Sequence, residues 1–175
     1  DHDLAFILQY ENIAWYEDGK VKILDRRIYP ARVEFVTCGT HQEVAQAITD
    51  MVTQSAGPYT AVPMGMALAA HECRDKTAAE QMEYLRKAAH TISHARPTTV
   101  KRMALLCDLC LAEAERALAA GEDTAQAIVN KTVELNNTRY ERVAKIGKYL
   151  VDLFPENGTV MTHCFAETIV GMMLR

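Results

Sequence analysis

The sequence has few aromatic residues, no long apolar segment and no surplus of basic residues. Aromatic side chains make up 7% of its 175 residues, against 49% apolar and 24% charged residues, proportions typical of a globular protein. It has no run of about 18 uncharged apolar residues, which argues against a membrane-spanning helix. Its formal net charge is −4. Because binding to phosphate backbones needs an excess of Lys and Arg, we expect no direct contact with nucleic acid.

Cysteine occurs five times, an odd number in a chain long enough to build its own hydrophobic core. Such usage favours reduced thiols over a framework of disulfide bonds. The sequence begins Asp1-His2-Asp3 without a basic and then apolar leader, so it predicts no signal peptide. We therefore expect a cytoplasmic protein.

The beginning of the chain carries a strong hairpin signal. Residues 13–16 and 21–24 favour β structure, and Asp18-Gly19 lies between them. Asp-Gly is typical of a tight turn, because glycine adopts a positive φ at no steric cost. Residues 32–37 alternate polar and apolar side chains and indicate a further strand. The sequence thus predicts a small β ribbon, and helices after it.

Helical spacing dominates the middle of the chain. Thr40 and Thr77 are each followed three residues later by glutamate, the pattern of a capping box, and then by apolar residues at helical spacing. Pro97 and Gly121 mark the beginning and the end of a third helical pattern. A fourth contains Asn136-Asn137, a pair of low helix propensity that predicts a break. We expect helices over residues 40–52, 77–89, 97–118 and 124–154.

The segment around residue 55 is rich in small residues. Ser55-Ala56-Gly57-Pro58 would let the backbone approach a ligand closely before another helical stretch, although such turns are also common as pure architecture. Residues 56–70 form the longest weakly polar run, and their prolines and glycines suit a packed turn better than a membrane span. Ser55 and Gly57 are therefore candidate ligand contacts.

The last residues change in character. Residues 155–158 predict a turn, residues 159–163 a short buried strand, and the residues from Cys164 onward a helix. Strand, turn and helix make the opening βα unit of an open α/β sheet, which needs further strands. We expect residues 1–175 to be the front part of a longer protein, with a helical domain over 1–155 and the start of a truncated Rossmann-like domain over 156–175.

Cys164 lies where α/β proteins gather ligands, at the end of the predicted strand and the beginning of a helix. The helix dipole at such a turn favours the thiolate, the form that acts as a nucleophile or base. The alternative is a small buried core residue. His163 precedes it on the strand and would point to the opposite face, so a simple Cys-His dyad is not expected.

Other candidate sites are weaker. Arg96 directly precedes a helix start, where its guanidinium and the unpaired amides could hold a phosphate, or where it is simply solvated. Cys107 and Cys110 have the spacing of a C-x-x-C motif but lie in the middle of a helix, which favours core thiols over a redox or zinc site. His90 and His94 could face one metal ion, but no third ligand follows in a recognisable pattern. The sequence predicts no metal and no cofactor.

Three segments together resemble the family that joins methylthioribose-1-phosphate isomerase, ribose-1,5-bisphosphate isomerase and the α, β and δ subunits of translation initiation factor 2B. Residues 12–27, ending Ile23-Leu-Asp-Arg-Arg, resemble the family's opening ribbon. Arg96-Pro-Thr-Thr-Val resembles its Arg-Pro-Thr-Ala-Val, and Val160-Met-Thr-His-Cys resembles its Leu-Thr-His-Cys. The three segments occur in the family's order along nearly the whole chain.

The resemblance implies a helical domain followed by a Rossmann-like domain, in a homodimer or larger homo-oligomer. It also implies a sugar-phosphate aldose–ketose isomerase, with a phosphorylated pentose such as methylthioribose 1-phosphate as substrate and a place in methionine salvage. Cys164 matches the family's catalytic thiol, and Arg96 matches a phosphate-binding arginine. The partner Asp belongs to the second domain, so we expect this chain to be inactive without that domain.

Two departures from the family pattern leave a second function open. The isomerases usually read Arg-Gly-Ala-Pro where this chain reads Ser55-Ala-Gly-Pro, and Asn with small residues where it has Phe165-Ala-Glu. One charge-assisted phosphate contact of about 1.5–3 kcal/mol is therefore missing. The alternative is a noncatalytic regulatory or assembly subunit related to translation initiation factor 2B, although that branch generally lacks the thiol that Cys164 supplies.

Overall fold

The computed structural model describes residues 3–164 and 166–174. A short 3₁₀ turn, η1 (Phe6–Leu8), and one turn of helix, α1 (Tyr10–Ile13), lead into a three-stranded antiparallel sheet. Its strands are β1 (Ala14–Glu17), β2 (Lys20–Leu24) and β3 (Phe35–Cys38), in that order. The predicted ribbon is confirmed.

The hairpin turn takes the conformation that its sequence favours. Asp18 and Gly19 both have positive φ, 49° and 71°, and the turn pairs Glu17 with Lys20 across β1 and β2. Val21 and Ile23 on β2 are fully buried, whereas the alternating residues Lys20 and Lys22 are exposed. This alternation gives the sheet one face to place against the helices.

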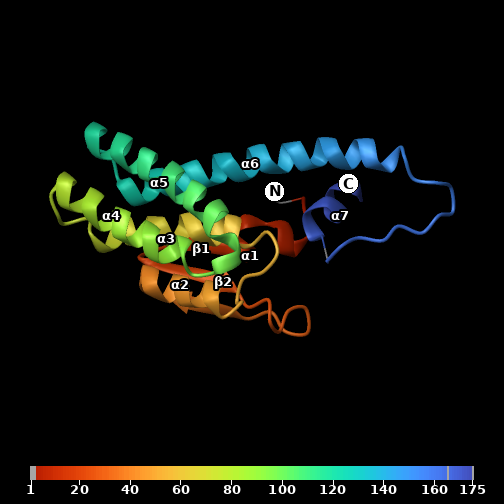
Figure 1. The fold of residues 1–175 in the computed structure, drawn as a ribbon, viewed down its shortest axis with the longest axis horizontal. Coiled ribbons are helices and arrows are strands. Elements are labelled where there is room, and N and C mark those ends of the chain that lie inside the picture. The colour runs from red at the N-terminus through yellow and green to blue at the C-terminus, as the bar shows by residue number, and fades with distance from the viewer. Residues whose placement is uncertain (1–2, 165, 175) are drawn as a thin grey trace.

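Helices make up most of the molecule (Figure 1). The first two capped helices are α2 (His41–Thr49) and α4 (Ala78–Ser93), and the side chains of Thr40 and Thr77 each accept a hydrogen bond from a glutamate N–H three residues on. Thr77 and Glu80 complete the reciprocal capping box. The remaining elements are α3 (Pro58–Glu72), η2 (Pro97–Thr99), α5 (Val100–Ala120), α6 (Thr124–Val151) and α7 (Glu167–Met173).

The helical stretch expected after Ser55-Ala-Gly-Pro is confirmed, whereas the packed turn favoured for residues 56–70 is wrong from residue 58 onward. Residues 58–70 belong to α3, which lies at the centre of the molecule and packs against α2, α4, α5, α6 and β1. Nearly every residue of α3 is buried. Gly65 permits this packing, because a Cβ there would lie 2.9 Å from Val44 and 3.1 Å from Ile92. No helix among the described residues is both long and apolar enough to cross a bilayer.

The predicted break at Asn136-Asn137 is also wrong, since α6 is continuous from Thr124 to Val151. Asn136 is buried and its amide donates a hydrogen bond of 3.2 Å to the Thr60 hydroxyl in α3. Asn137 accepts a hydrogen bond from the Tyr10 hydroxyl. These tertiary contacts offset the low helix propensity of the pair, which local sequence reasoning could not include.

Residues 159–163 form no strand, contrary to the prediction. They lie exposed in a loop that leaves the end of α6 and returns to α7 (Figure 1). No strand pairs with them within the described part of the chain, and an isolated strand has no partners for its backbone groups. The helix expected after Cys164 is present as α7, whereas the Rossmann-like unit and the boundary at residues 155/156 stay predictions.

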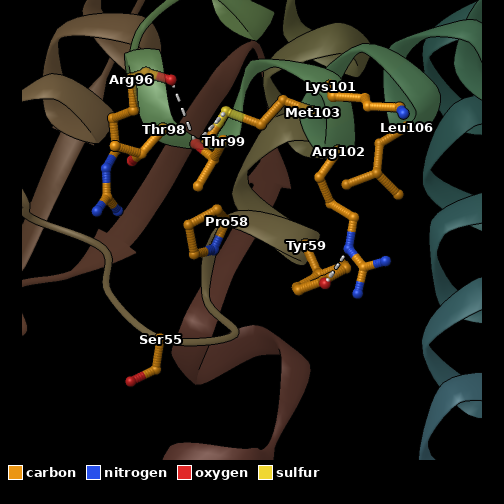
Figure 2. A pocket seen from close by; sticks show the side chains of 10 residues that line it. All are labelled: Ser55, Pro58, Tyr59, Arg96, Thr98, Thr99, Lys101, Arg102, Met103 and Leu106. Carbon is orange, nitrogen blue, oxygen red and sulfur yellow. Dashed lines mark hydrogen bonds between the residues drawn. The ribbon is translucent and has the colours of Figure 1, made fainter. Parts of the chain in front are cut away.

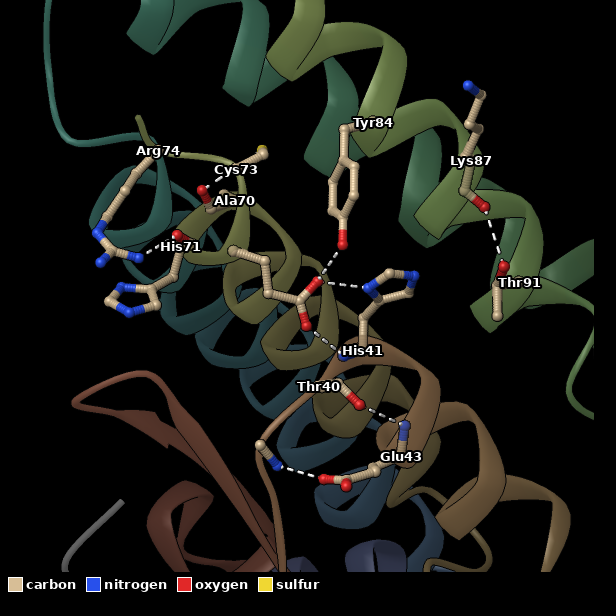
Figure 3. Close-up of polar contacts among 12 residues, drawn as sticks. Thr40, His41, Glu43, Ala70, His71, Cys73, Arg74, Tyr84, Lys87 and Thr91 are labelled. Atoms are coloured by element: carbon tan, nitrogen blue, oxygen red, sulfur yellow. Dashed lines mark hydrogen bonds and ion pairs between the residues drawn. The ribbon is translucent and has the colours of Figure 1, made fainter. Parts of the chain in front are cut away.

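A buried polar network joins three helices. The Glu72 carboxylate, at the end of α3, accepts a 2.7 Å hydrogen bond from the His41 backbone N–H, lies 2.5 Å from His41 Nδ1, and accepts a 2.9 Å hydrogen bond from the Tyr84 hydroxyl. Figure 3 shows His41 and Tyr84 pointing toward this carboxylate from α2 and α4. The network fixes the relative positions of the three helices.

Candidate functional site

The Arg96 region forms a cavity of about 430 Å³ at one end of α3 and α5. Arg96 is the N-cap residue of η2, which runs directly into α5. Figure 2 shows Arg96 extending toward the side of the cavity where Ser55 lies, and Arg102 lying beside Tyr59. The structure thus brings together Arg96 and Ser55, two of the side chains singled out from sequence.

The cavity is electropositive. Three cations line it, Arg96, Lys101 and Arg102, and none of its described lining residues is acidic. The hydroxyl groups of Ser55, Tyr59, Thr98 and Thr99 add hydrogen-bonding capacity. Guanidinium and ammonium groups beside hydroxyls suit a phosphate or another oxyanion.

Sequence reasoning missed the contribution of Tyr59, Lys101 and Arg102. Arg102 Nε donates a hydrogen bond to the Tyr59 hydroxyl, and its guanidinium carbon lies 5.2 Å from the centre of the Tyr59 ring. This contact holds Arg102 at the cavity wall. Their position in the sequence could have indicated Lys101 and Arg102, because both lie on the first turn of α5, directly after the Arg96 segment.

Ser55 and Gly57 have different parts in the turn before α3. Ser55 has a φ of 52°, in the left-handed region, and its side chain lines the cavity. A Cβ on Gly57 would come within 2.1 Å of the Thr53 hydroxyl oxygen, so the tight turn itself requires glycine there. The predicted ligand contact of Gly57 stays a prediction, because packing alone explains this glycine.

Cys164 lies at the turn before α7 and is exposed, which contradicts the alternative of a buried core residue. Its sulfur lies 3.7 Å from the Ser55 hydroxyl oxygen. A second hollow of about 310 Å³ is lined by Ser55, Cys164 and Glu167. Ser55 lines both hollows, so it separates the Cys164 thiol from the electropositive cavity and contacts both. The catalytic role of Cys164 stays a prediction.

Glu167 is a further charged residue that sequence reasoning did not single out. Its side chain is 6% exposed, and its carboxylate forms an ion pair of 3.4 Å with Nη1 of Arg26. Arg26 lies two residues after the end of β2. This pair connects the beginning of α7 to the sheet region. It therefore helps to hold the turn that carries Cys164.

The remaining candidates lack the geometry of a site. Burial raises the pKa of the Cys107 thiol to about 12, and burial likewise raises the pKa of Cys110, so both behave as protonated core residues. The rings of His90 and His94 lie 4.0 Å apart. No group of three or more His, Cys, Asp or Glu residues in the described ranges could hold a metal ion.

The fold and the cavity define a helical domain with a small β ribbon and a pocket suited to an oxyanion. Residues 56–175, more than half of the chain, match the Initiation factor 2 subunit family. The chain belongs to this family, and the resemblance seen in its sequence is confirmed.

Relatives in this family include named isomerases. The chain is 31% identical over 159 residues to methylthioribose-1-phosphate isomerase of Carboxydothermus hydrogenoformans, covering 89% of this chain and 45% of the relative. It is 28% identical over 163 residues to the enzyme of that name from Thermotoga maritima, covering 93% and 46%. The chain therefore spans less than half the length of these relatives.

Solved structures with the same fold include a translation factor subunit. The structure of subunit delta of translation initiation factor eIF-2B from A. fulgidus has a TM-score of 0.72 and 26% identity, over 92% of this chain and 47% of that one. The structure of 5-methylthioribose 1-phosphate isomerase from Pyrococcus horikoshii has a TM-score of 0.55 and 24% identity, over 77% and 40%. The second similarity shows the fold alone.

Proposed function

We propose that this chain is the front part of a sugar-phosphate aldose–ketose isomerase of the methylthioribose-1-phosphate isomerase type. The observation that carries the proposal is the shared position of Ser55, between a cavity lined by three cations and the exposed Cys164 thiol. A phosphate held by the cations would place the adjoining sugar carbons toward the sulfur. The isomerase relatives named above support this reading.

The proposed reaction moves hydrogen between the adjacent sugar carbons C1 and C2, with proton exchange at their oxygen atoms. Arg96, Lys101 and Arg102 would bind the phosphate, and Cys164 would give or take a proton near C1 and C2. Excluding water from such a site keeps the migrating hydrogen from exchanging with solvent. The proposal also requires a second domain with a partner carboxylate, and a homo-oligomer.

The test is turnover of methylthioribose 1-phosphate by the purified full-length protein, followed by NMR. We expect Cys164→Ser to lower kcat by about 10²- to 10⁴-fold, the usual size of an acid–base contribution. Arg96→Gln should raise KM by about tenfold or more, because it removes a charge-assisted contact. Arg86→Gln, on the exposed face of α4, is the matched control and should leave both constants unchanged. Unchanged turnover in Cys164→Ser would refute the proposal.

A noncatalytic regulatory or assembly subunit is the second candidate. It is favoured by Ser55, which stands where the resembling isomerases carry a phosphate-binding arginine, and by the similarity to eIF-2B subunit delta. Affinity capture of the full-length protein with mass spectrometry should then recover a stoichiometric partner subunit. A monodisperse homodimer with isomerase activity would contradict this second function.

A further inference from the structure

A second electropositive cavity lies between α5 and α6. It has a volume of about 290 Å³ and is lined by Arg102, Arg139 and Arg142. None of its described lining residues is acidic. Arg139 and Arg142 belong to α6 and do not line the Arg96 cavity, whereas Tyr59 and Arg102 line both. Arg139 and Arg142, unlike Arg102, thus have no role in the proposed isomerase chemistry.

Arg139 forms a hydrogen bond with the Tyr140 side chain, but two of its nitrogen atoms are left without a partner within the described part of the chain. Its guanidinium carbon lies 5.1 Å from the centre of the Tyr59 ring and 4.9 Å from that of Tyr140. Its Nε and Nη2 atoms are buried, and neither has a hydrogen-bond partner among the described residues. Buried donors are nearly always satisfied in native proteins, so an unsatisfied pair calls for an acceptor.

The surrounding charges do not supply that acceptor. Glu167 is the carboxylate that acts electrostatically on Arg139, but the 3.4 Å ion pair of Glu167 is with Arg26. Burial lowers the pKa of Arg139, although a guanidinium stays protonated in proteins. Arg102 and Arg142 line the same cavity, so three positively charged side chains share it and no described lining residue is acidic.

We propose that the α5–α6 cavity is a second binding site, for a small phosphate monoester. The three arginines supply donors for the phosphate oxygens, and small shifts of the Arg139 side chain would bring its unsatisfied nitrogen atoms into contact with them. Leu105, Leu106 and Leu135 line the same cavity and offer an apolar wall to the remainder of the ligand. This inference does not rest on the proposed isomerase activity.

The experiment is a calorimetric titration of the purified full-length protein with phenyl phosphate, in low-salt buffer free of other phosphates. Arg96→Gln weakens binding at the first cavity selectively, because Arg96 lines only that cavity, whereas Arg142 lines only the α5–α6 cavity. In that background, binding should persist, and adding Arg142→Gln should weaken it by about tenfold or more, as expected for a lost charge-assisted contact. Arg139→Gln should weaken it further.

Controls separate this result from general charge effects and from misfolding. Arg142 is exposed, so its substitution keeps the test valid if Arg139→Gln fails to fold. Arg86→Gln on α4 removes an exposed cation that lines neither cavity, and it should leave the affinity for phenyl phosphate unchanged. Loss of all binding in Arg96→Gln alone, or equal weakening by Arg86→Gln, would overturn the proposal. So would an absence of binding to the wild-type protein, which would indicate that another part of the full-length protein supplies the acceptor.

Discussion

Glu72 shows, at the scale of a single residue, how this fold keeps a carboxylate charged in its interior. Burial alone would raise the pKa of Glu72, but the hydrogen bonds from His41 and Tyr84 more than offset it and leave the pKa below its ordinary value of 4.5. The folded state therefore binds this proton less readily than the unfolded state. It follows that the contribution of Glu72 to stability is full above about pH 4.5 and is lost as the pH falls below that value.

We predict that Glu72→Gln lowers the free energy of unfolding at pH 7 by about 1–3 kcal/mol, because the hydrogen bonds lose their charged acceptor. The difference from wild type should shrink on acidification toward pH 3. Urea unfolding at several pH values measures both effects. Glu83→Gln is the matched control, since the exposed ion pair of Glu83 with Lys87 is screened by solvent and should matter little. A constant difference across this pH range would contradict the linkage.

At the same scale, sequence reasoning singles out Arg96, Ser55 and Cys164 as candidates but not the residues that surround them. Arg96 is a candidate because it directly precedes a helix start, and Cys164 because it follows an apolar run and precedes a helix. Lys101 and Arg102 were missed because a basic residue on a helix is usually solvated, and only the packing of α3 beside α5 brings Tyr59 into contact with Arg102.

At the scale of elements, α3 depends on close approach to its neighbours. Alanine has a higher helix propensity than glycine by about 1 kcal/mol, so propensity alone would make Gly65→Ala stabilising. The new Cβ would, however, lie 2.9 Å from Val44 and 3.1 Å from Ile92, and both residues are fully buried. We predict a net loss of about 1–2 kcal/mol in the free energy of unfolding, because overpacking outweighs propensity.

A double-mutant cycle tests this cause. Val44→Ala should itself be destabilising, because it leaves a cavity. In the double variant, the methyl group that Gly65→Ala adds would occupy part of that space, so the combined loss should be smaller than the sum of the two separate losses. Thermal or urea unfolding of the four proteins measures the coupling. Strict additivity would show that Val44 is not what opposes the substitution.

The elements divide into those that local signals predict and those that require tertiary contacts. Capping residues and the Asp18-Gly19 turn act within a few residues, and the helices and hairpin they predict are present. The uninterrupted course of α6 depends on Thr60 and Tyr10, which are distant in sequence from Asn136 and Asn137. The strand predicted over residues 159–163 failed for the converse reason, since β-branched apolar residues without a partner strand form no sheet.

At the scale of the whole molecule, a small apolar cluster joins the two ends of the chain. Leu8 is 2% exposed and packs with Tyr140 of α6 and Met172 of α7. The Tyr140 hydroxyl donates a 2.7 Å hydrogen bond to the Leu8 carbonyl oxygen. Gly171 lies so close to Leu8 that a Cβ would approach its Cδ1 to 2.4 Å. This cluster, with the Arg26–Glu167 ion pair, positions α7 and so the turn that carries Cys164.

We therefore predict that Leu8→Ala loosens α7 selectively. Truncating a buried leucine costs about 2–5 kcal/mol, and here the cavity would open beside a helix of only seven residues. Hydrogen exchange should show faster exchange in α7 relative to α5 than in wild type. Leu85→Ala is the matched control, because Leu85 is equally buried but lies in the main core cluster. If Leu8→Ala and Leu85→Ala change the ratio of α7 exchange to α5 exchange equally, α7 is held by the fold as a whole. The small apolar cluster would then have no special part in positioning Cys164.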